Sequence, residues 1–453
     1  MRFILAILVG KLIFFLTRNF KLGGGSAAPG LYALSIEPNL VAKLAAKIPK
    51  NVVITGTNGK TTTAKMLAHF AKETGLKVIR NHTGSNLERG IASTLISCVN
   101  LCVNLKGCRL NFDLGIWELD EAAFNNVTPK LNPEVVIFLN VFRDQLDRYG
   151  EIDTVTKNWC QALKKLSSET AVLVNGDDAN ILKLAACFRG KVQKFGVKDY
   201  TIAGESIIHK KEIENLDFEA KNVKTNGLTG ISFSLSLHYQ SSIVHLPVPG
   251  IYHIYDFLAA FAAGTMLNID PDEMVLSLKT YSPAFGRVEK FHLNPTSHRT
   301  PTSEVGYMGY IFLIKNPAGA TQVFETIAPN IKPGDRMLLA LNDNIADGTD
   351  VSWIWDANFE LIQNSSNLSE RAKSRDYTII ASGSRANDLA LRLKYANFNP
   401  KEIKIQPDLK QALKQAGMGL KGKLFILPTY TAMLELQSIL TKAGIKKHYW
   451  EDE

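Results

Sequence analysis

The sequence predicts an α/β protein with a parallel central sheet, a β-rich insertion and a second, smaller α/β domain. Short apolar runs alternate with helix-length segments from Asn51 onward, which is the order that builds parallel sheets. Between about residues 194 and 248 the runs change to apolar–polar alternation, as in Ile231–Leu237, which favours antiparallel strands with one solvated face. A stretch rich in Pro, Ser and Thr at 295–301 has the composition of a linker. We therefore expect three parts, at residues 1–45, 46–294 and 295–453.

The first part begins with an apolar stretch, Phe3–Leu16, interrupted by Lys11. A helix of this length rises about 21 Å, short of the roughly 30 Å of a bilayer's hydrocarbon core, so we do not expect a membrane span. No convincing cleavage site follows, which argues against a secretory signal. Basic residues at positions 2, 11, 18 and 21 suit a helix that lies on a membrane surface, and packing against the protein is the alternative.

The central part opens with a strand, a helix and a strand. These are expected at Val52–Thr55, Thr61–Thr74 and Lys77–Arg80. Later apolar runs extend the same sheet, and they lie at 114–117, 135–139 and 171–174. A helix from about Tyr255 to Leu267 follows the insertion.

The last part repeats the alternation of strands and helices. Strand-like runs lie at Arg336–Leu341, Tyr377–Ser382 and Leu424–Leu427, and a helical pattern covers Asn387–Ala396. We therefore expect a Rossmann-like α/β domain here.

The composition argues against a disordered or collagen-like chain. Hydrophobic residues make up 45% and charged residues 21%, as in soluble globular proteins, so most of the chain should fold. The net charge of +9 favours anionic ligands or an anionic membrane face, and charge alone gives no reason to expect a nucleic acid partner. The five cysteines form neither a CxxC pair nor an even set, so we expect reduced thiols and a cytoplasmic protein.

A phosphate-binding loop is predicted between the first strand and the first helix of the central part. Glycines let the main chain approach phosphate groups, and the start of a helix attracts anions. Lys60 can neutralise phosphate oxygens and the hydroxyl of Thr61 can hold Mg²⁺. Strict Walker A spacing would place a glycine where Ile54 stands, so the general pattern is only partly met. The predicted nucleotide-binding residues of the loop are Gly56, Thr57, Asn58, Gly59, Lys60, Thr61 and Thr62.

The stretch GTNGKTTTA at 56–64 resembles the ATP loop of the Mur ligase superfamily. The resemblance implies that Glu118, at the end of a strand, helps Thr61 to bind Mg²⁺, and that Asn175 and Arg287 contact the nucleotide. Residues 140–150 resemble the superfamily's N-x3-DHLD-x2-G stretch, but Gln145 replaces the usual histidine.

Longer matches point to one branch of this superfamily, the MurT family. The stretches FRDQLDRYGEID at 142–153, NHTGSNL at 81–87, KNPAG at 315–319 and LNDNIADGTDVSWIWD at 341–356 resemble MurT segments. MurT proteins commonly carry a four-cysteine zinc ribbon, but residues 191–290 contain no cysteine, so we expect no zinc site there. The family's helix start GxxNxxN appears as Gly250-Ile251-Tyr252-His253-Ile254-Tyr255-Asp256, with both asparagines changed.

The resemblance implies the synthetase subunit of a lipid II isoglutaminyl synthase, which amidates the α-carboxylate of D-glutamate through an acyl phosphate. ATP and Mg²⁺ would be required, and ammonia would come from a GatD-like glutaminase subunit. Asp350 would complete that partner's Cys–His–Asp triad, while Lys60 and Glu118 would serve the ATP reaction. Activity is then expected in the cytoplasm, with peripheral contact at the inner membrane face.

Two other functions remain open from the sequence. A conventional Mur or folylpolyglutamate ligase would add an amino acid and need no partner. A nucleotide-binding module would bind ATP without catalysis.

Overall fold

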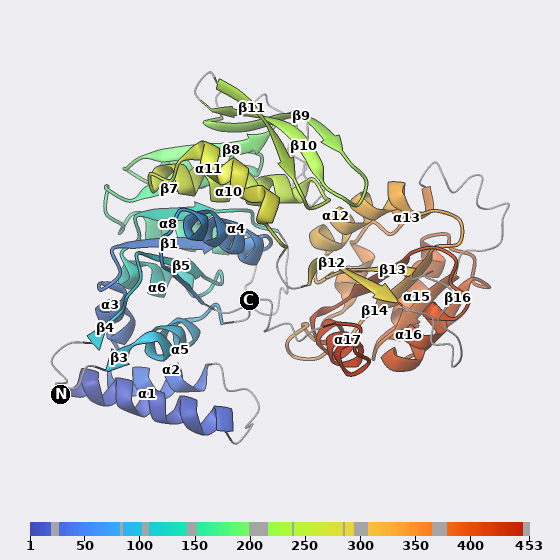
Figure 1. Ribbon diagram of the computed structural model, residues 1–453, viewed down its shortest axis with the longest axis horizontal. Coiled ribbons are helices and arrows are strands. Elements are labelled where there is room, and N and C mark those ends of the chain that lie inside the picture. The colour runs from blue at the N-terminus through green and yellow to red at the C-terminus, as the bar shows by residue number, and fades with distance from the viewer. Residues whose placement is uncertain are drawn as a thin grey trace.

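Two large sheets organise the chain, and they lie side by side in Figure 1. The computed structural model describes residues 1–19, 27–81, 85–101, 108–142, 152–198, 216–237, 240–283, 286–293, 307–364 and 378–446. The predicted α/β class is confirmed in both sheets.

The first sheet has nine strands in the order β11-β10-β9-β8-β7-β6-β1-β5-β2. Neighbours from β2 to β9 run parallel, and β9, β10 and β11 are antiparallel. Its strands are β1 (Lys50–Thr55), β2 (Val78–Arg80), β5 (Leu114–Glu118), β6 (Val135–Phe138), β7 (Ala171–Asn175), β8 (Val192–Val197), β9 (Phe218–Thr225), β10 (Ile231–Leu237) and β11 (Gln240–Leu246). The short strands β3 (Asn100–Leu101) and β4 (Cys108–Arg109) form a separate pair. The predicted antiparallel strands are present, and they continue the central sheet, because β9 pairs with β8.

Helices cover both faces of this sheet. Along β1, Val52 and Ile54 face one core cluster and Val53 faces the other, as strand geometry requires. The helices on the first face are α4 (Lys60–Glu73), α10 (Tyr252–Met266) and α11 (Pro271–Ser277). The second face carries α3 (Leu40–Ala45), α5 (Glu88–Cys98), α6 (Phe124–Leu131), α8 (Ile152–Leu163), α9 (Ala179–Leu182) and the 3-10 turn η1 (Lys183–Cys187). The parallel strands at the centre of the sheet are thus buried on both sides, which explains their continuous apolar runs.

The N-terminal segment forms two helices, α1 (Arg2–Asn19) and α2 (Ala28–Ile36), which pack together and onto α5 (Figure 1). A Cβ atom at Gly30 would lie 1.9 Å from the carbonyl oxygen of Arg89, so only glycine permits this crossing of α2 and α5. Within the described ranges, no helix has the length and apolar character needed to cross a membrane.

The second sheet has six strands in the order β12-β13-β17-β14-β15-β16, and all neighbours are parallel except β12 and β13. Its strands are β12 (Arg287–Leu293), β13 (Tyr307–Phe312), β14 (Arg336–Ala340), β15 (Thr378–Ser382), β16 (Ile403–Ile405) and β17 (Leu424–Pro428). Its helices are α12 (Pro317–Ile327), α13 (Glu360–Asn364), α15 (Ala386–Tyr395), α16 (Leu409–Gly417) and α17 (Tyr430–Lys442), with short 3-10 turns at 328–330 and at η4 (Ser352–Trp355). The sheet begins with β12, ahead of the domain boundary that we expected at residue 295.

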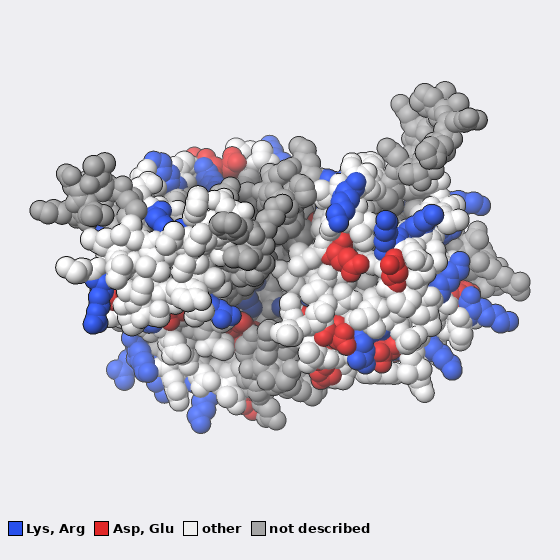
Figure 2. Space-filling view, turned by 90° about the horizontal axis from the view of Figure 1, so that it is seen from below, with Lys and Arg blue, Asp and Glu red and all other residues white. Residues whose placement is uncertain are grey.

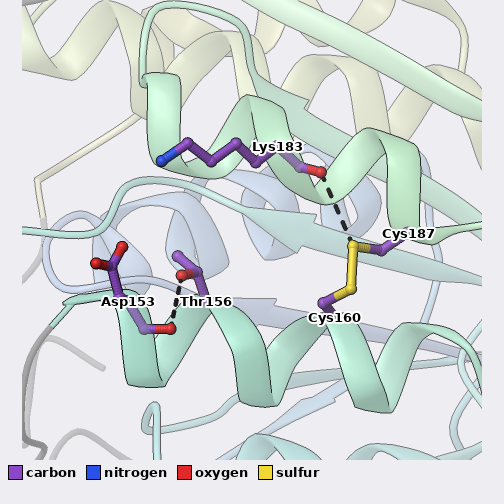
Figure 3. Close-up of a disulfide and its surroundings, with 5 residues drawn as sticks. All are labelled: Asp153, Thr156, Cys160, Lys183 and Cys187. Carbon is purple, nitrogen blue, oxygen red and sulfur yellow. Dashed lines mark hydrogen bonds between the residues drawn. A yellow bond between two sulfur atoms is a disulfide. The ribbon is translucent and has the colours of Figure 1, made fainter.

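The expectation that all cysteines are thiols is wrong. Cys160 on α8 and Cys187 at the end of η1 form a disulfide (Figure 3). They are separated by 27 positions in the sequence, but α8 packs against η1 and brings their Cα atoms to 5.3 Å. Spacing in the sequence could not reveal this tertiary contact, because it depends on how α8 and η1 pack.

Candidate functional site

The predicted phosphate loop lies where β1 ends and α4 begins. Gly56 and Gly59 both have positive φ angles, 141° and 90°, which glycine adopts without strain. A Cβ atom at Gly59 would lie 2.3 Å from Oδ1 of Asp256, so the loop passes close to α10. The N–H groups of the first turn of α4 have no acceptor in the preceding turn, and this end of the helix favours an anion.

Asn140, which follows strand β6, holds the loop in place. The Thr57 N–H donates to the Asn140 carbonyl at 3.0 Å, and the Asn58 N–H donates to Asn140 Oδ1 at 2.8 Å. In return, Asn140 Nδ2 donates to the Asn58 carbonyl at 3.0 Å. These bonds join the loop to the segment that follows β6, so the backbone conformation is fixed before any ligand binds.

Lys60 folds back over its own loop. Its Nζ donates to the carbonyls of Gly56 and Thr57, and it lies 3.8 Å from a carboxylate oxygen of Glu121. Burial raises the pKa of Glu121 to about 7, although the nearby Lys60 acts in the opposite direction. Sequence reasoning missed Glu121, because nothing in the stretch after β5 distinguishes it from a surface acid.

Thr61 and Glu118 meet across the loop. The Thr61 hydroxyl donates to Glu118 Oε2 at 2.8 Å, and the Glu118 side chain is buried at the end of β5. Asn81 fixes this position, because its side chain accepts from the Glu118 N–H at 2.8 Å and donates to the Glu118 carbonyl at 3.0 Å.

The Thr61–Glu118 pair fits Mg²⁺. A hydroxyl and a carboxylate oxygen beside a phosphate loop suit this ion, which retains waters and takes few protein ligands. The described parts of the chain hold no group of three or more His, Cys, Asp and Glu side chains suited to a metal.

The loop opens into a cleft between the two sheets. Asn58, Gly59 and Thr62 line one side and Asn175 lies at the end of β7, where its Nδ2 donates to the Leu139 carbonyl at 2.8 Å. The predicted loop residues and Asn175 are therefore brought together in one place.

The start of α10 adds two buried polar side chains to this cleft. His253 Nδ1 lies 3.1 Å from Asp256 Oδ2, and the Thr63 hydroxyl donates to Asp256 Oδ1 at 3.4 Å. His253 Nε2 is buried and has no hydrogen-bond partner among the described residues. These two residues stand where the sequence showed changed asparagines, and that departure was the signal that could have marked them as site residues.

The second sheet closes the cleft from the other side. Lys315 Nζ donates to the Thr57 carbonyl at 3.1 Å. The side-chain amides of Asn58 and Asn316 pair reciprocally, at 3.2 and 3.0 Å. From the sequence, KNPAG at 315–319 was only one of the stretches that resemble the family. In the structure this stretch also contacts the predicted phosphate loop directly.

Asp350 lies apart from the phosphate loop, on the loop that follows β14. It is exposed, and its Oδ1 accepts from the Ser352 N–H at 2.8 Å. Asp347, three residues earlier, is buried and accepts from the Thr431 N–H at 2.7 Å at the start of α17. Asp343 contacts Ser384 and Arg385, and these hydrogen bonds lower its pKa. Asp347 and Asp343 are therefore tied to neighbouring elements, and Asp350 lies on the surface.

Some predicted segments cannot be placed. Residues 143–151, which include Gln145, and residues 82–84 lie outside the described residues. Arg287 begins β12, but its side chain also lies outside the described parts.

Comparison with known proteins assigns a family to this arrangement. The Mur ligase middle domain model matches residues 54–264, and the MurT ligase C-terminal model matches residues 313–433. A lipid II isoglutaminyl synthase (glutamine-hydrolyzing) subunit MurT from Streptococcus pneumoniae is 30% identical, over 94% of this chain and 94% of the relative. The subunit of that name from Staphylococcus aureus is 27% identical, over 92% and 93%.

Solved structures agree on the fold. MurF from Acinetobacter baumannii superposes with a TM-score of 0.67 at 17% identity, over 91% of this chain and 80% of that chain. Folylpolyglutamate synthase from Mycobacterium tuberculosis gives 0.61 at 14% identity, over 88% and 92%. At these identities the likeness concerns the fold alone, whereas the match to the MurT subunits spans nearly the whole sequence. The chain therefore belongs to the MurT family of Mur ligase-like proteins.

Proposed function

We propose that this chain is the ATP-dependent synthetase subunit of a lipid II isoglutaminyl synthase. It converts the α-carboxylate of D-glutamate in lipid II to an amide during peptidoglycan synthesis. The observation that carries the proposal is the phosphate loop, which opens into a cleft closed by the MurT-type second domain. The full-length likeness to subunits named for this reaction supports it.

The chemistry explains why ATP is needed. A carboxylate is a poor electrophile and its oxygen is a poor leaving group, so ammonia does not displace it at neutral pH. The carboxylate attacks the γ-phosphate of ATP, breaks its bond to the β-phosphate oxygen and releases ADP, which leaves an acyl phosphate. Ammonia then attacks the acyl carbon, loses a proton and displaces inorganic phosphate to leave the amide.

Different residues of the site bind the phosphates and the metal ion in this reaction. The loop N–H groups and Lys60 hold the phosphates, and the cleft positions the nucleotide beside Asn175. Thr61 and Glu118 would hold Mg²⁺, which supplies charge neutralisation at the phosphates when bound. For Lys60 to reach a phosphate, its Nζ must leave the loop carbonyls that it now contacts.

Ammonia is supplied by a partner in this proposal. The curated relatives are named as subunits of a glutamine-hydrolyzing enzyme, and we propose a GatD-like glutaminase as the other subunit. Asp350 would orient that partner's catalytic histidine, and its exposure on the surface suits this role. Trp355 and Tyr395, which belong to the same domain as Asp350, are exposed and contact each other edge to face, with their ring centroids 5.5 Å apart. Exposed Trp and Tyr side chains are enriched among the anchors of protein interfaces.

The location follows from the two substrates. Lipid II is held in the membrane and ATP is cytoplasmic, so we propose that the enzyme works at the inner face of the plasma membrane.

The first test removes the phosphate contact. Lys60→Ala should abolish ATP-dependent amidation of lipid II with glutamine or with free ammonium, because both reactions need the activated carboxylate. Lys72→Ala is the matched control, since Lys72 is exposed on the same helix α4. Product is measured by mass spectrometry of the stem peptide. Full ammonium-driven activity in Lys60→Ala would refute the proposal.

The second test separates synthesis from nitrogen supply. Asp350→Asn keeps an acceptor for the Ser352 N–H but loses the charge. We expect at least a hundredfold loss of the glutamine-driven rate with the partner present, and an unchanged ammonium-driven rate. Equal losses in the two assays would contradict the role assigned to Asp350.

A further inference from the structure

Helix α1 presents a stripe of large apolar side chains to solvent. Leu5, Leu8, Leu12 and Phe15 are three or four residues apart, so they share one face of the helix. Leu12 and Phe15 are 58% and 60% exposed. A surface helix of a protein that meets only water carries polar residues on this face.

The stripe cannot turn inward, because the opposite face of α1 is already packed. Ala6, Ile7 and Gly10 are buried. A Cβ atom at Gly10 would lie 2.8 Å from the Ile96 side chain of α5, which shows how closely the helix sits on the protein. One face of α1 therefore packs against the protein, and the other face remains exposed.

The surroundings of the stripe are basic. Arg2 and Lys11 lie on its two edges, roughly 90° from its centre on a helix of 3.6 residues per turn. Neither α1 nor α2 contains an acidic residue. On the adjoining helix α2, Leu31 and Tyr32 are 51% and 55% exposed.

Figure 2 views the molecule from below, the side on which α1 lies in Figure 1. Its left half, over α1, is largely uncoloured, with Lys and Arg at the margins.

We propose that this surface docks on an anionic lipid bilayer, with α1 parallel to the membrane and its apolar stripe at the boundary between headgroups and acyl chains. Apolar residues flanked by basic ones match the two layers of such a boundary. A second copy of the chain fits less well, because a symmetric contact would bring the basic edges together, and neither α1 nor α2 offers an acidic residue to pair with them. The contribution of docking to catalysis rests on the proposed function, whereas the docking itself rests on this surface alone.

The experiment measures partition of the full chain, with its glutaminase partner bound, onto vesicles of phosphatidylglycerol and phosphatidylcholine. Co-sedimentation should be strong and should weaken with added salt or with phosphatidylcholine alone. The double variant Leu12→Glu/Phe15→Glu should lose at least tenfold in partition. Leu276→Glu is the matched control, because Leu276 is an equally exposed leucine on α11, and it should bind as the unaltered protein does. Equal melting temperatures establish that the variants are folded.

Several outcomes would overturn the inference. These are no vesicle binding by the unaltered complex, equal loss in the Leu276→Glu control, and binding by the isolated chain that disappears when the partner is bound. A dimer in light scattering that the double variant dissociates, without vesicle binding, would assign the stripe to a second copy.

A second readout separates this inference from the proposed function. Amidation should fall in the double variant with vesicle-bound lipid II but stay unchanged with lipid II in detergent micelles. If the unaltered enzyme amidates neither substrate, the proposed function fails, while the vesicle binding still decides the docking surface.

Discussion

At the scale of single residues, the site combines groups that sequence patterns reveal with groups that only the fold brings together. Lys60 and Thr61 follow a strand and open a helix, so the local sequence predicts that they contact phosphates. Glu121, His253 and Asp256 reach the same loop from distant segments, and no spacing rule connects them with it. Sequence patterns therefore did not predict these three residues, whereas the family resemblance did predict Glu118 and Asn175.

Glu121 gives a pH-dependent prediction. Its pKa is raised from 4.5 to about 7, so the folded protein favours the neutral carboxyl. The neutral Glu121 carboxyl makes its full contribution to the free energy of unfolding below about pH 4.5. This contribution, on the order of 3 kcal/mol, is lost as the pH rises through about 7. Glu121→Gln should remove this decline and be more stable than the unaltered protein at pH 8. The test measures the melting temperatures of both proteins from pH 5 to 8. If the two melting temperatures change with pH in parallel, Glu121 does not titrate in this range.

At the scale of elements, the strand and helix pattern could be read from the sequence, but the pairing of distant elements could not. The parallel strands β1, β6 and β7 lie where apolar runs predicted them. The pairing of β9 with β8, which continues this sheet, was not predicted. Apolar–polar alternation within a strand shows which residues share a face, but it does not show which strand lies beside it.

The start of α12 gives a prediction at this scale. Asn316 caps the helix, because its Oδ1 accepts from the Gly319 N–H at 2.8 Å, and it also pairs with Asn58. Asn316→Ala should cost about 1 kcal/mol for the cap and a similar amount for the lost pair. A double-mutant cycle with Asn58→Ala, followed by chemical denaturation, isolates the pair. A coupling energy of zero would show that the two amides act independently.

The disulfide between α8 and η1 gives another prediction. A cross-link across 27 positions should stabilise the fold by about 3 kcal/mol, mainly by restricting the unfolded chain. Cys160→Ala should therefore melt at a lower temperature than the unaltered protein without reductant, and dithiothreitol should remove the difference. Cys98→Ala is the control, because Cys98 is a free thiol, and it should respond to dithiothreitol as the unaltered protein does. An unaltered protein that melts identically with and without reductant would contradict the prediction.

At the scale of the whole molecule, the cleft is a property of two domains together. The central domain supplies the phosphate loop, and the second domain reaches it through Lys315 and Asn316. The sequence revealed two α/β units and the MurT resemblance, but the contact between them arises from surfaces more than 250 residues apart. This arrangement lets the domain that would meet the glutaminase also touch the loop that would hold ATP.

The central claim is that ATP bound at this loop activates the glutamate carboxylate. The most direct measurement uses lipid II with ¹⁸O in that carboxylate, together with ATP, Mg²⁺ and ammonium. We predict that one ¹⁸O atom per turnover appears in inorganic phosphate with the unaltered protein and none with Lys60→Ala. Amide formation without ¹⁸O in the released phosphate would contradict the account.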